Sequence, residues 1–420
     1  MPTPEVIGAP TEYTEPEMVQ RAARLRDRLE ATGWLDVTAA AALGFLVLLA
    51  VGGVLALAAK LNFPSIGADA DLLDAFTAIV MAGLGSLGIP IVIDGLVVSA
   101  LPLGALLAVG IGIMWAVRTS LRDASFTGVA GAIAYGARVG IPFGLLCWFF
   151  ALVFRLRGQH PVGSDGGVAL VSGVFWGALF GALGAVRVME HLRAALRRIT
   201  SGLAARDRTS FEGTSTGFLM LGSVTILGAG AVLLWIIVAL ARGAPGGHFG
   251  AGDAFAYVVY VAAFLPNIIA AIVSLAMGAP VDVGAKVNLG GKLVGPMREY
   301  SLATWGGGDP PSVVWFLVLV PVFACALGGF VASRRATDQK TMVPVVLLGS
   351  AVFAVALTLL SAIGSLRMAG VVKGSGFGAV EPRTVMVLLF AFLMAGVVGS
   401  LGWNLAQRTD LLKDRFPQAG

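Results

Sequence analysis

Long apolar stretches that carry almost no charge constrain this chain more than any other feature of its sequence. Apart from Asp74, at the start of the second stretch, none of the ten contains Asp, Glu, Lys, Arg or His. A helix of about 20 apolar residues crosses the roughly 30 Å hydrocarbon core of a bilayer. The sequence therefore predicts an all-α polytopic membrane protein. The ten stretches cover residues 37–59, 72–88, 101–117, 139–154, 168–186, 217–241, 254–277, 313–333, 342–366 and 384–406.

The composition supports the same class. Hydrophobic residues make up 57% of the chain and charged residues 13%, which is too little charge to cover a soluble surface. The net charge of +5 does not call for a nucleic acid, because basic residues gather on cytoplasmic loops beside anionic lipid heads. We predict a plasma-membrane protein that contacts the lipid bilayer and has no nucleic-acid partner.

Short repeated fragments predict an internal duplication. Residues 78–80 (Ala-Ile-Val) and 88–90 (Gly-Ile-Pro) recur as 271–273 (Ala-Ile-Val) and 278–280 (Gly-Ala-Pro). We therefore predict two similar five-segment halves. The predicted domains are a cytoplasmic N-terminal tail with an amphipathic helix (1–36), a first membrane repeat (37–187), a basic cytoplasmic linker helix (188–216), a second membrane repeat (217–406) and a cytoplasmic C-terminal tail (407–420).

Two segments between the apolar stretches predict small extracytoplasmic β-hairpins. Asp94 and Gly95 stand between two runs of β-branched and aliphatic residues, which is the strongest short signal for a hairpin. The strand-like stretch 281–289 occupies the matching place in the second half.

Basic residues discriminate between two membrane topologies. If all ten stretches cross from a cytoplasmic N-terminus, 13 of the 29 Lys and Arg residues lie inside and 16 outside. If the second and seventh stretches instead enter and return on the outer face, 19 lie inside and 10 outside, in line with the positive-inside rule. We predict eight crossings, two re-entrant or broken helices, and both termini in the cytoplasm. Pro266 and Asn267 are predicted to split the seventh stretch into two half-helices that are too short to cross.

Five residues are candidates for a functional role: Asp74, Asp94, Asp253, Pro266 and Asn267. Asp74 lies one turn inside its stretch and Asp253 lies just before its own, and both positions suit a carboxylate at a helix N-terminus; a cation site at the outer mouth is the alternative. Catalytic motifs and metal-ligand spacings are missing from the sequence. The chain is therefore predicted to be no enzyme and to bind no metal or cofactor.

Residues 187–208 form a basic amphipathic stretch that is a candidate for binding lipids or a protein partner. Arg193, Arg197 and Arg198 are predicted to meet anionic lipid heads at the inner leaflet, and docking of a cytoplasmic partner is the alternative.

Glycines at four-residue spacing predict close packing of helices. A homo-oligomer seam along the same faces is the alternative. These glycines are Gly136, just before the fourth stretch, Gly140 and Gly144 within it, and Gly173, Gly177 and Gly181 in the fifth.

The order of the segments is similar to that of two families of actinobacterial polytopic membrane proteins, the streptophobe family and the cell-division-associated PerM-type family. Matching fragments are 93–95 (Ile-Asp-Gly), 101–104 (Leu-Pro-Leu-Gly), 265–267 (Leu-Pro-Asn) and 333–335 (Ser-Arg-Arg). The resemblance implies a plasma-membrane protein linked to the envelope or to division, and it supplies no catalytic residues. The predicted function is a non-enzymatic membrane protein that acts through envelope or division partners. The alternative is a transporter or channel for a small or lipid-like substrate at the interface of the two repeats.

Overall fold

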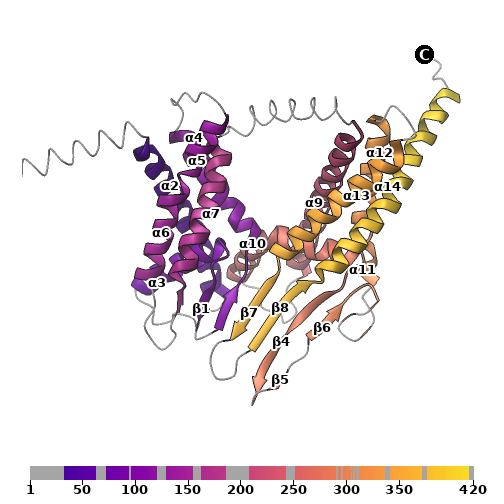
Figure 1. Cartoon of the computed structure of the whole chain (residues 1–420). Coiled ribbons are helices and arrows are strands. Elements are labelled where there is room, and N and C mark those ends of the chain that lie inside the picture. The colour runs from indigo at the N-terminus through magenta and orange to yellow at the C-terminus, as the bar shows by residue number, and fades with distance from the viewer. Residues whose placement is uncertain are drawn as a thin grey trace, which may run out of the picture.

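Helices make up most of the computed structural model, and an antiparallel sheet lies at one end of them (Figure 1). The first half of the chain forms α2 (Trp34–Asn62), α3 (Leu72–Ser86), α4 (Leu103–Ser120), α5 (Val129–Ala137), α6 (Gly140–Val153) and α7 (Gly166–Ala185). The second half forms α9 (Arg208–Arg242), α10 (Ala251–Ala276), α11 (Ser312–Leu317), α12 (Leu319–Arg335), α13 (Met342–Ile363) and α14 (Thr384–Arg415). The structure describes residues 33–62, 72–93, 96–120, 129–154, 162–185, 208–242, 251–289, 292–294, 297–303, 305, 308, 312–335, 341–370 and 376–415.

Nine helical segments within these described ranges are long and apolar enough to cross a membrane. α5 and α6 together form one of them, and α3, with 15 residues, is a shorter apolar helix. Every apolar stretch identified in the sequence falls on one helix or on two consecutive helices. The prediction of a multi-pass α-helical membrane protein is therefore confirmed.

Two helices extend beyond the apolar stretches that predicted them. α9 begins at Arg208, within the region 188–216 that the sequence assigned to a linker, and α14 continues to Arg415, past residue 406. Both extensions are more polar than the rest of their helices. A helix can continue through the headgroup region into water, since its backbone hydrogen bonds are internal.

Eight strands in the described part of the chain pair into one antiparallel sheet, in the order β3-β1-β2-β7-β8-β4-β5, with β6 also beside β4. Their bounds are β1 (Ile91–Ile93), β2 (Leu96–Ser99), β3 (Val162–Ser164), β4 (Val281–Leu289), β5 (Lys292–Val294), β6 (Met297–Tyr300), β7 (Leu366–Gly370) and β8 (Gly376–Pro382). β1 and β2 form the expected hairpin, with Ile93 opposite Leu96, and β4 matches the expected strand.

The sheet is larger than the separate small hairpins that the sequence predicted. β2 pairs with β7 over four residues, from Leu96 opposite Gly370 to Ser99 opposite Arg367. This pairing joins strands from the two halves of the chain. A hairpin alone would leave rows of unpaired backbone N–H and C=O groups at its edges, and pairing with further strands satisfies them.

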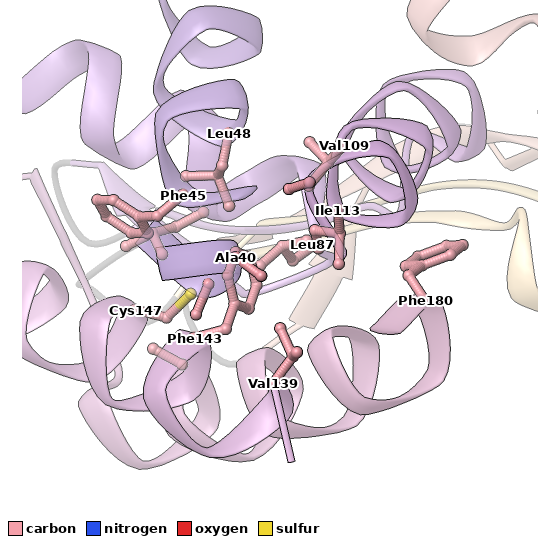
Figure 2. Packing of buried hydrophobic residues seen from close by; sticks show 14 of the residues in the cluster. Ala40, Phe45, Leu48, Leu87, Val109, Ile113, Val139, Phe143, Cys147 and Phe180 are labelled. Carbon is pink, nitrogen blue, oxygen red and sulfur yellow. The ribbon is translucent and has the colours of Figure 1, made fainter. Parts of the chain in front are cut away.

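Each half of the chain has its own apolar core. In the first half, side chains of α2, α4 and α6 converge, with Leu48, Ile113 and Phe143 fully buried (Figure 2). In the second half, α9, α12, α13 and α14 surround Met220, Phe353 and other buried side chains. Burial of such side chains and their close packing hold each helical group together.

The glycines at four-residue spacing lie at one helix contact inside the first half. A Cβ atom built on Gly136 would lie 2.3 Å from the carbonyl oxygen of Gly181, and one on Gly140 would lie 2.4 Å from the carbonyl oxygen of Val174. On the other helix, a Cβ on Gly173 would lie 2.8 Å from the Cα of Gly144. The backbones of α5, α6 and α7 therefore approach closely, as the helix-packing interpretation predicted.

The two helical groups meet mainly on the side of the sheet. The extensive contacts between the halves are those of α10 with α2 and α4, together with the pairing of β2 and β7. Towards the face where the C-terminus lies, the first-half helices and the second-half helices stand apart (Figure 1). The molecule thus has the outline of a wedge that is closed at the sheet.

Candidate functional site

α3 and α10 end in the same way: the end of each helix contacts another helix well inside that helix's length. Leu87, just after α3, accepts a hydrogen bond through its carbonyl oxygen from Nε1 of Trp176, in the middle of α7, at 3.2 Å. Four residues later, Ile91 pairs with Ser164, directly before α7 begins. Gly88 between them has a φ of 74°, which favours glycine.

After α10 the chain follows the same path in the second half. A Cβ on Gly278, whose φ is 95°, would lie 3.7 Å from the ring of Phe390, about two turns inside α14. Three residues later, Val281 pairs with Pro382, directly before α14 begins. Both helices therefore end at a left-handed glycine among packed helices, and the following strand leads back to the sheet.

Asn267 of α10 links the two halves of the molecule through side-chain hydrogen bonds. Its Nδ2 donates to the carbonyl oxygens of Leu101 (2.8 Å) and Gly364 (3.0 Å), and its Oδ1 accepts from the backbone N–H of Leu103 (3.0 Å). Leu101 and Leu103 flank the start of α4, whereas Gly364 caps the end of α13. We call this group the Asn267 junction.

The chemistry of the amide suits the junction. Two of its three partners are carbonyl oxygens that need a donor, and the third is an N–H that needs an acceptor. A carboxylate has no N–H to offer, and an aliphatic side chain can bond to none of the three. The Asn267 side chain is 9% exposed, so these bonds are sheltered from water.

The prediction that Pro266 and Asn267 split this helix is wrong. α10 runs without interruption from Ala251 to Ala276, with Pro266 inside it. A proline removes the N–H that would bond to the carbonyl four residues earlier, here that of Ala262. Gly104 of α4 packs against that carbonyl: a Cβ on Gly104 would lie 2.1 Å from the Ala262 oxygen. Packing of the neighbouring helices keeps α10 continuous, as tertiary contacts can for a proline in a membrane helix.

A second polar contact of α10 lies on the same helix face, two turns beyond Asn267. The hydroxyl groups of Ser274 and Ser361 of α13 are 3.1 Å apart, and Ser274 also donates to the carbonyl of Ala270. Both serines are buried. This contact lies within the second half and adds polar attachment between α10 and α13.

A charged cluster lies on the sheet, outside the helices. Nε and Nη2 of Arg383 donate to the two carboxylate oxygens of Asp282 at 3.0 and 3.1 Å, and Nη2 also reaches Glu299 at 2.7 Å. The hydrogen bonds and charge of Asp282 raise the pKa of Arg383 above its ordinary value, and Glu299 adds to this effect. Asp282 is paired across the sheet with both Glu299 and Glu381, so three acidic residues stand in one row.

The predicted acidic candidates do not form one site with Asn267. Asp74 and Asp253 lie in the first turns of α3 and α10, where the helix dipole favours a carboxylate. Among the residues that the structure describes, no three or more His, Cys, Asp or Glu side chains group as metal ligands would. Asp94 lies outside the described residues, as do Arg193, Arg197 and Arg198.

Known proteins provide no template for this arrangement. No protein-family model, no curated protein and no solved structure matches the chain. Interpretation of the molecule therefore depends on its own contacts.

The sequence did not point to Arg383, Asp282 and Glu299 as a cluster. Asp282 and Arg383 are about 100 residues apart in the chain, and each is an ordinary charged residue of a loop or strand. A local signal did exist: Asp282 falls within the predicted strand 281–289 in alternation with apolar residues, which puts it on one face of the sheet.

Proposed function

We propose that this chain is a multi-pass plasma-membrane protein that binds a partner in the cell envelope or the division machinery and performs no chemistry of its own. The observation that carries the proposal is the eight-stranded sheet, which draws strands from both halves into one folded surface. A transmembrane bundle needs no such sheet to be stable in a bilayer, since its helices satisfy their own backbone groups. A surface built outside the bundle suits recognition by another molecule.

The proposal includes a topology of eight crossings, in which α3 and α10 enter the bundle and leave on the side of the sheet. Its support is the shared path after the two helices, where Ile91 and Val281 pair with residues that directly precede α7 and α14. α3 is also too short to cross the hydrocarbon core. α10 is long enough to cross, but six other candidate spans in the described residues lie between β2 and β7, so a seventh crossing by α10 would place these two paired strands on opposite faces.

We propose further that the sheet is extracytoplasmic and that both termini are cytoplasmic, because the loops away from the sheet carry most of the basic residues. Thiol labelling of intact cells tests this orientation. Arg298→Cys on β6 should react with a membrane-impermeant maleimide, and Arg408→Cys on α14 should react only after lysis; both positions are exposed. The native thiols of Cys147 and Cys325 are buried and provide a low background. The reverse pattern would exclude the orientation.

The part of the sheet around β4 and β6 is the surface that we expect to bind the partner. It carries the Arg383 cluster and an edge-to-face contact between Tyr300 and Trp305, whose ring centroids are 5.0 Å apart. Aromatic and arginine side chains are enriched in protein interfaces. The resemblance to streptophobe and PerM-type proteins points to an envelope or division partner and stays a prediction.

Site-specific photocrosslinking in living cells tests the proposal. A photoreactive amino acid at Arg298 or Ala303, both exposed beside this surface, should give a discrete protein adduct of defined mass. The matched control is the same amino acid at Arg408, which is exposed on the opposite face. Adducts from all three positions at equal yield, or from none, would contradict a partner specific for the sheet.

The alternative function is transport of a small or lipid-like substrate at the interface of the two repeats. It is favoured by the matched chain paths after α3 and α10, since related segments in equivalent places of two halves are typical of transporters. Vesicles with fluorescent lipid in both leaflets test the lipid-like case. Protein-dependent reduction of the inner-leaflet dye by external dithionite would support transport, and a signal equal to that of protein-free vesicles would contradict it.

A further inference from the structure

One face of α4 begins at a contact with the second half of the molecule and is exposed beyond that contact. Gly104, at the start of α4, packs against the carbonyl groups of Ala262 and Ala263 in α10. Residues 107, 111 and 115 follow on the same face of the helix, because spacings of three, four and seven residues return to one side. These are Leu107, Ile111 and Trp115, with exposed fractions of 49%, 60% and 57%.

Polarity changes along this face in a regular order. Leu107 and Ile111 are aliphatic, Trp115 follows one turn later, and the exposed Arg118 ends the series in the last turn of α4. A phospholipid changes in the same order along its length, from acyl chain through the interfacial region to the phosphate. Tryptophan favours the interfacial level of a bilayer, and arginine binds the phosphate above it.

We propose that the face formed by Leu107, Ile111, Trp115 and Arg118 holds one anionic phospholipid beside the contact of α4 with α10, where the two halves meet. Its acyl chain lies along Leu107 and Ile111, and its phosphate accepts hydrogen bonds from the guanidinium group of Arg118. The face begins at the contact of α4 with α10, and α4 runs from there towards the end of the molecule that carries the C-terminus (Figure 1). The lipid therefore comes from the leaflet on that side. This site is independent of any partner bound to the sheet.

The chain offers a matched control on the periphery of the bundle. Val397, Leu401 and Leu405 of α14 are 62%, 62% and 57% exposed, and the exposed Arg408 follows them in the same helical order. α14 lies at the far side of the second half from α4 (Figure 1). This face of α14 has the same order of apolar side chains and arginine and faces the surrounding bilayer. Substitution of its arginine therefore measures the general attraction of an exposed arginine for anionic lipid.

Native mass spectrometry of the purified full-length protein with phosphatidylglycerol in detergent tests the site. Arg118→Gln should weaken retention of one bound phosphatidylglycerol about fivefold, the share that one arginine contributes near a membrane surface. Arg408→Gln should leave that lipid in place. An equal loss from both variants, or no loss from either, would overturn the proposal.

Further controls distinguish an anionic lipid from a neutral lipid and from free phosphate, and show whether the variant is folded. Phosphatidylcholine, which has the same phosphate and no net charge, should be retained no better by the wild type than by Arg118→Gln. Inorganic phosphate at a tenfold molar excess over phosphatidylglycerol should not displace it, because the acyl chain contributes to binding; displacement would show a site for free phosphate and overturn the proposal. An unchanged melting temperature of Arg118→Gln without added lipid shows that the variant is folded.

Discussion

Replacement of Asn267 by leucine should weaken the attachment between the two halves of the molecule. The change keeps the size of the side chain and removes all three hydrogen bonds of the Asn267 junction. Hydrogen bonds between membrane helices contribute about 0.6 kcal/mol each on average. We therefore expect a loss of about 2 kcal/mol in the free energy of unfolding, or about 2 °C in melting temperature for a chain of this length, in detergent.

Two variants control for the nature of this loss. Ser274→Ala removes a hydrogen bond of the same helix that lies within the second half, so its cost should be near that of a single bond. Asn267→Asp keeps an acceptor for Leu103 but turns an oxygen towards two carbonyl groups, and it should be at least as destabilising as Asn267→Leu. If Asn267→Leu cost no more than Ser274→Ala, the junction would contribute nothing beyond an ordinary helix contact.

A disulfide on the sheet separates attachment between the halves from stability within one half. Ser99 and Arg367 lie opposite each other on β2 and β7, which belong to different halves. In a Ser99→Cys/Arg367→Cys background, oxidation should recover part of the stability lost in Asn267→Leu, since it tethers the same two groups of helices. No recovery on oxidation would indicate that Asn267 acts inside the second half alone.

Three other substitutions test particular contacts by thermal unfolding in detergent. Gly104→Ala should lower the free energy of unfolding by about 1–3 kcal/mol, because the added Cβ meets the α10 backbone. Gly53→Ala, with open space around it, should be neutral or slightly stabilising, and equal effects of the two changes would refute the close approach. Pro266→Ala should not destabilise α10, because the helix is continuous and alanine restores an N–H, and a loss above about 1 kcal/mol would show that the proline is needed. Arg383→Gln should cost at most about 1 kcal/mol, and the cost should vanish at 1 M salt, since the ion pairs are exposed; Arg298→Gln is the control.

Local patterns in the sequence predicted the helices and the strands well. Apolar stretches predicted the positions of the membrane helices in the described part of the chain, and the Asp-Gly pair located the hairpin of β1 and β2. The prediction of a helix break at Pro266 was wrong because it considered only the backbone hydrogen bond that proline removes. The packing of α4 against α10 could not be read from the sequence. Contacts between residues far apart in the chain carry no local signal.

The candidate site was predictable only where a single residue carried a local signal. Asn267 stood out because an amide is rare in an apolar stretch, but its three partners come from two distant helix ends. The Arg383 cluster was not foreseen, since charged residues outside apolar stretches are common. A single buried polar residue can be found by composition, whereas an exposed pair requires knowledge of the strand register.

The pairing of β2 with β7 has a consequence for biosynthesis. The two strands are roughly 270 residues apart, so β2 is complete long before its partner has been made. At a synthesis rate of about 5–20 residues per second, one edge of the first hairpin waits for roughly 15–50 s. An uncovered strand edge can pair with other chains during that interval. The last loop to leave the ribosome therefore completes the sheet, and a chain truncated before residue 366 would keep a sheet edge that invites aggregation.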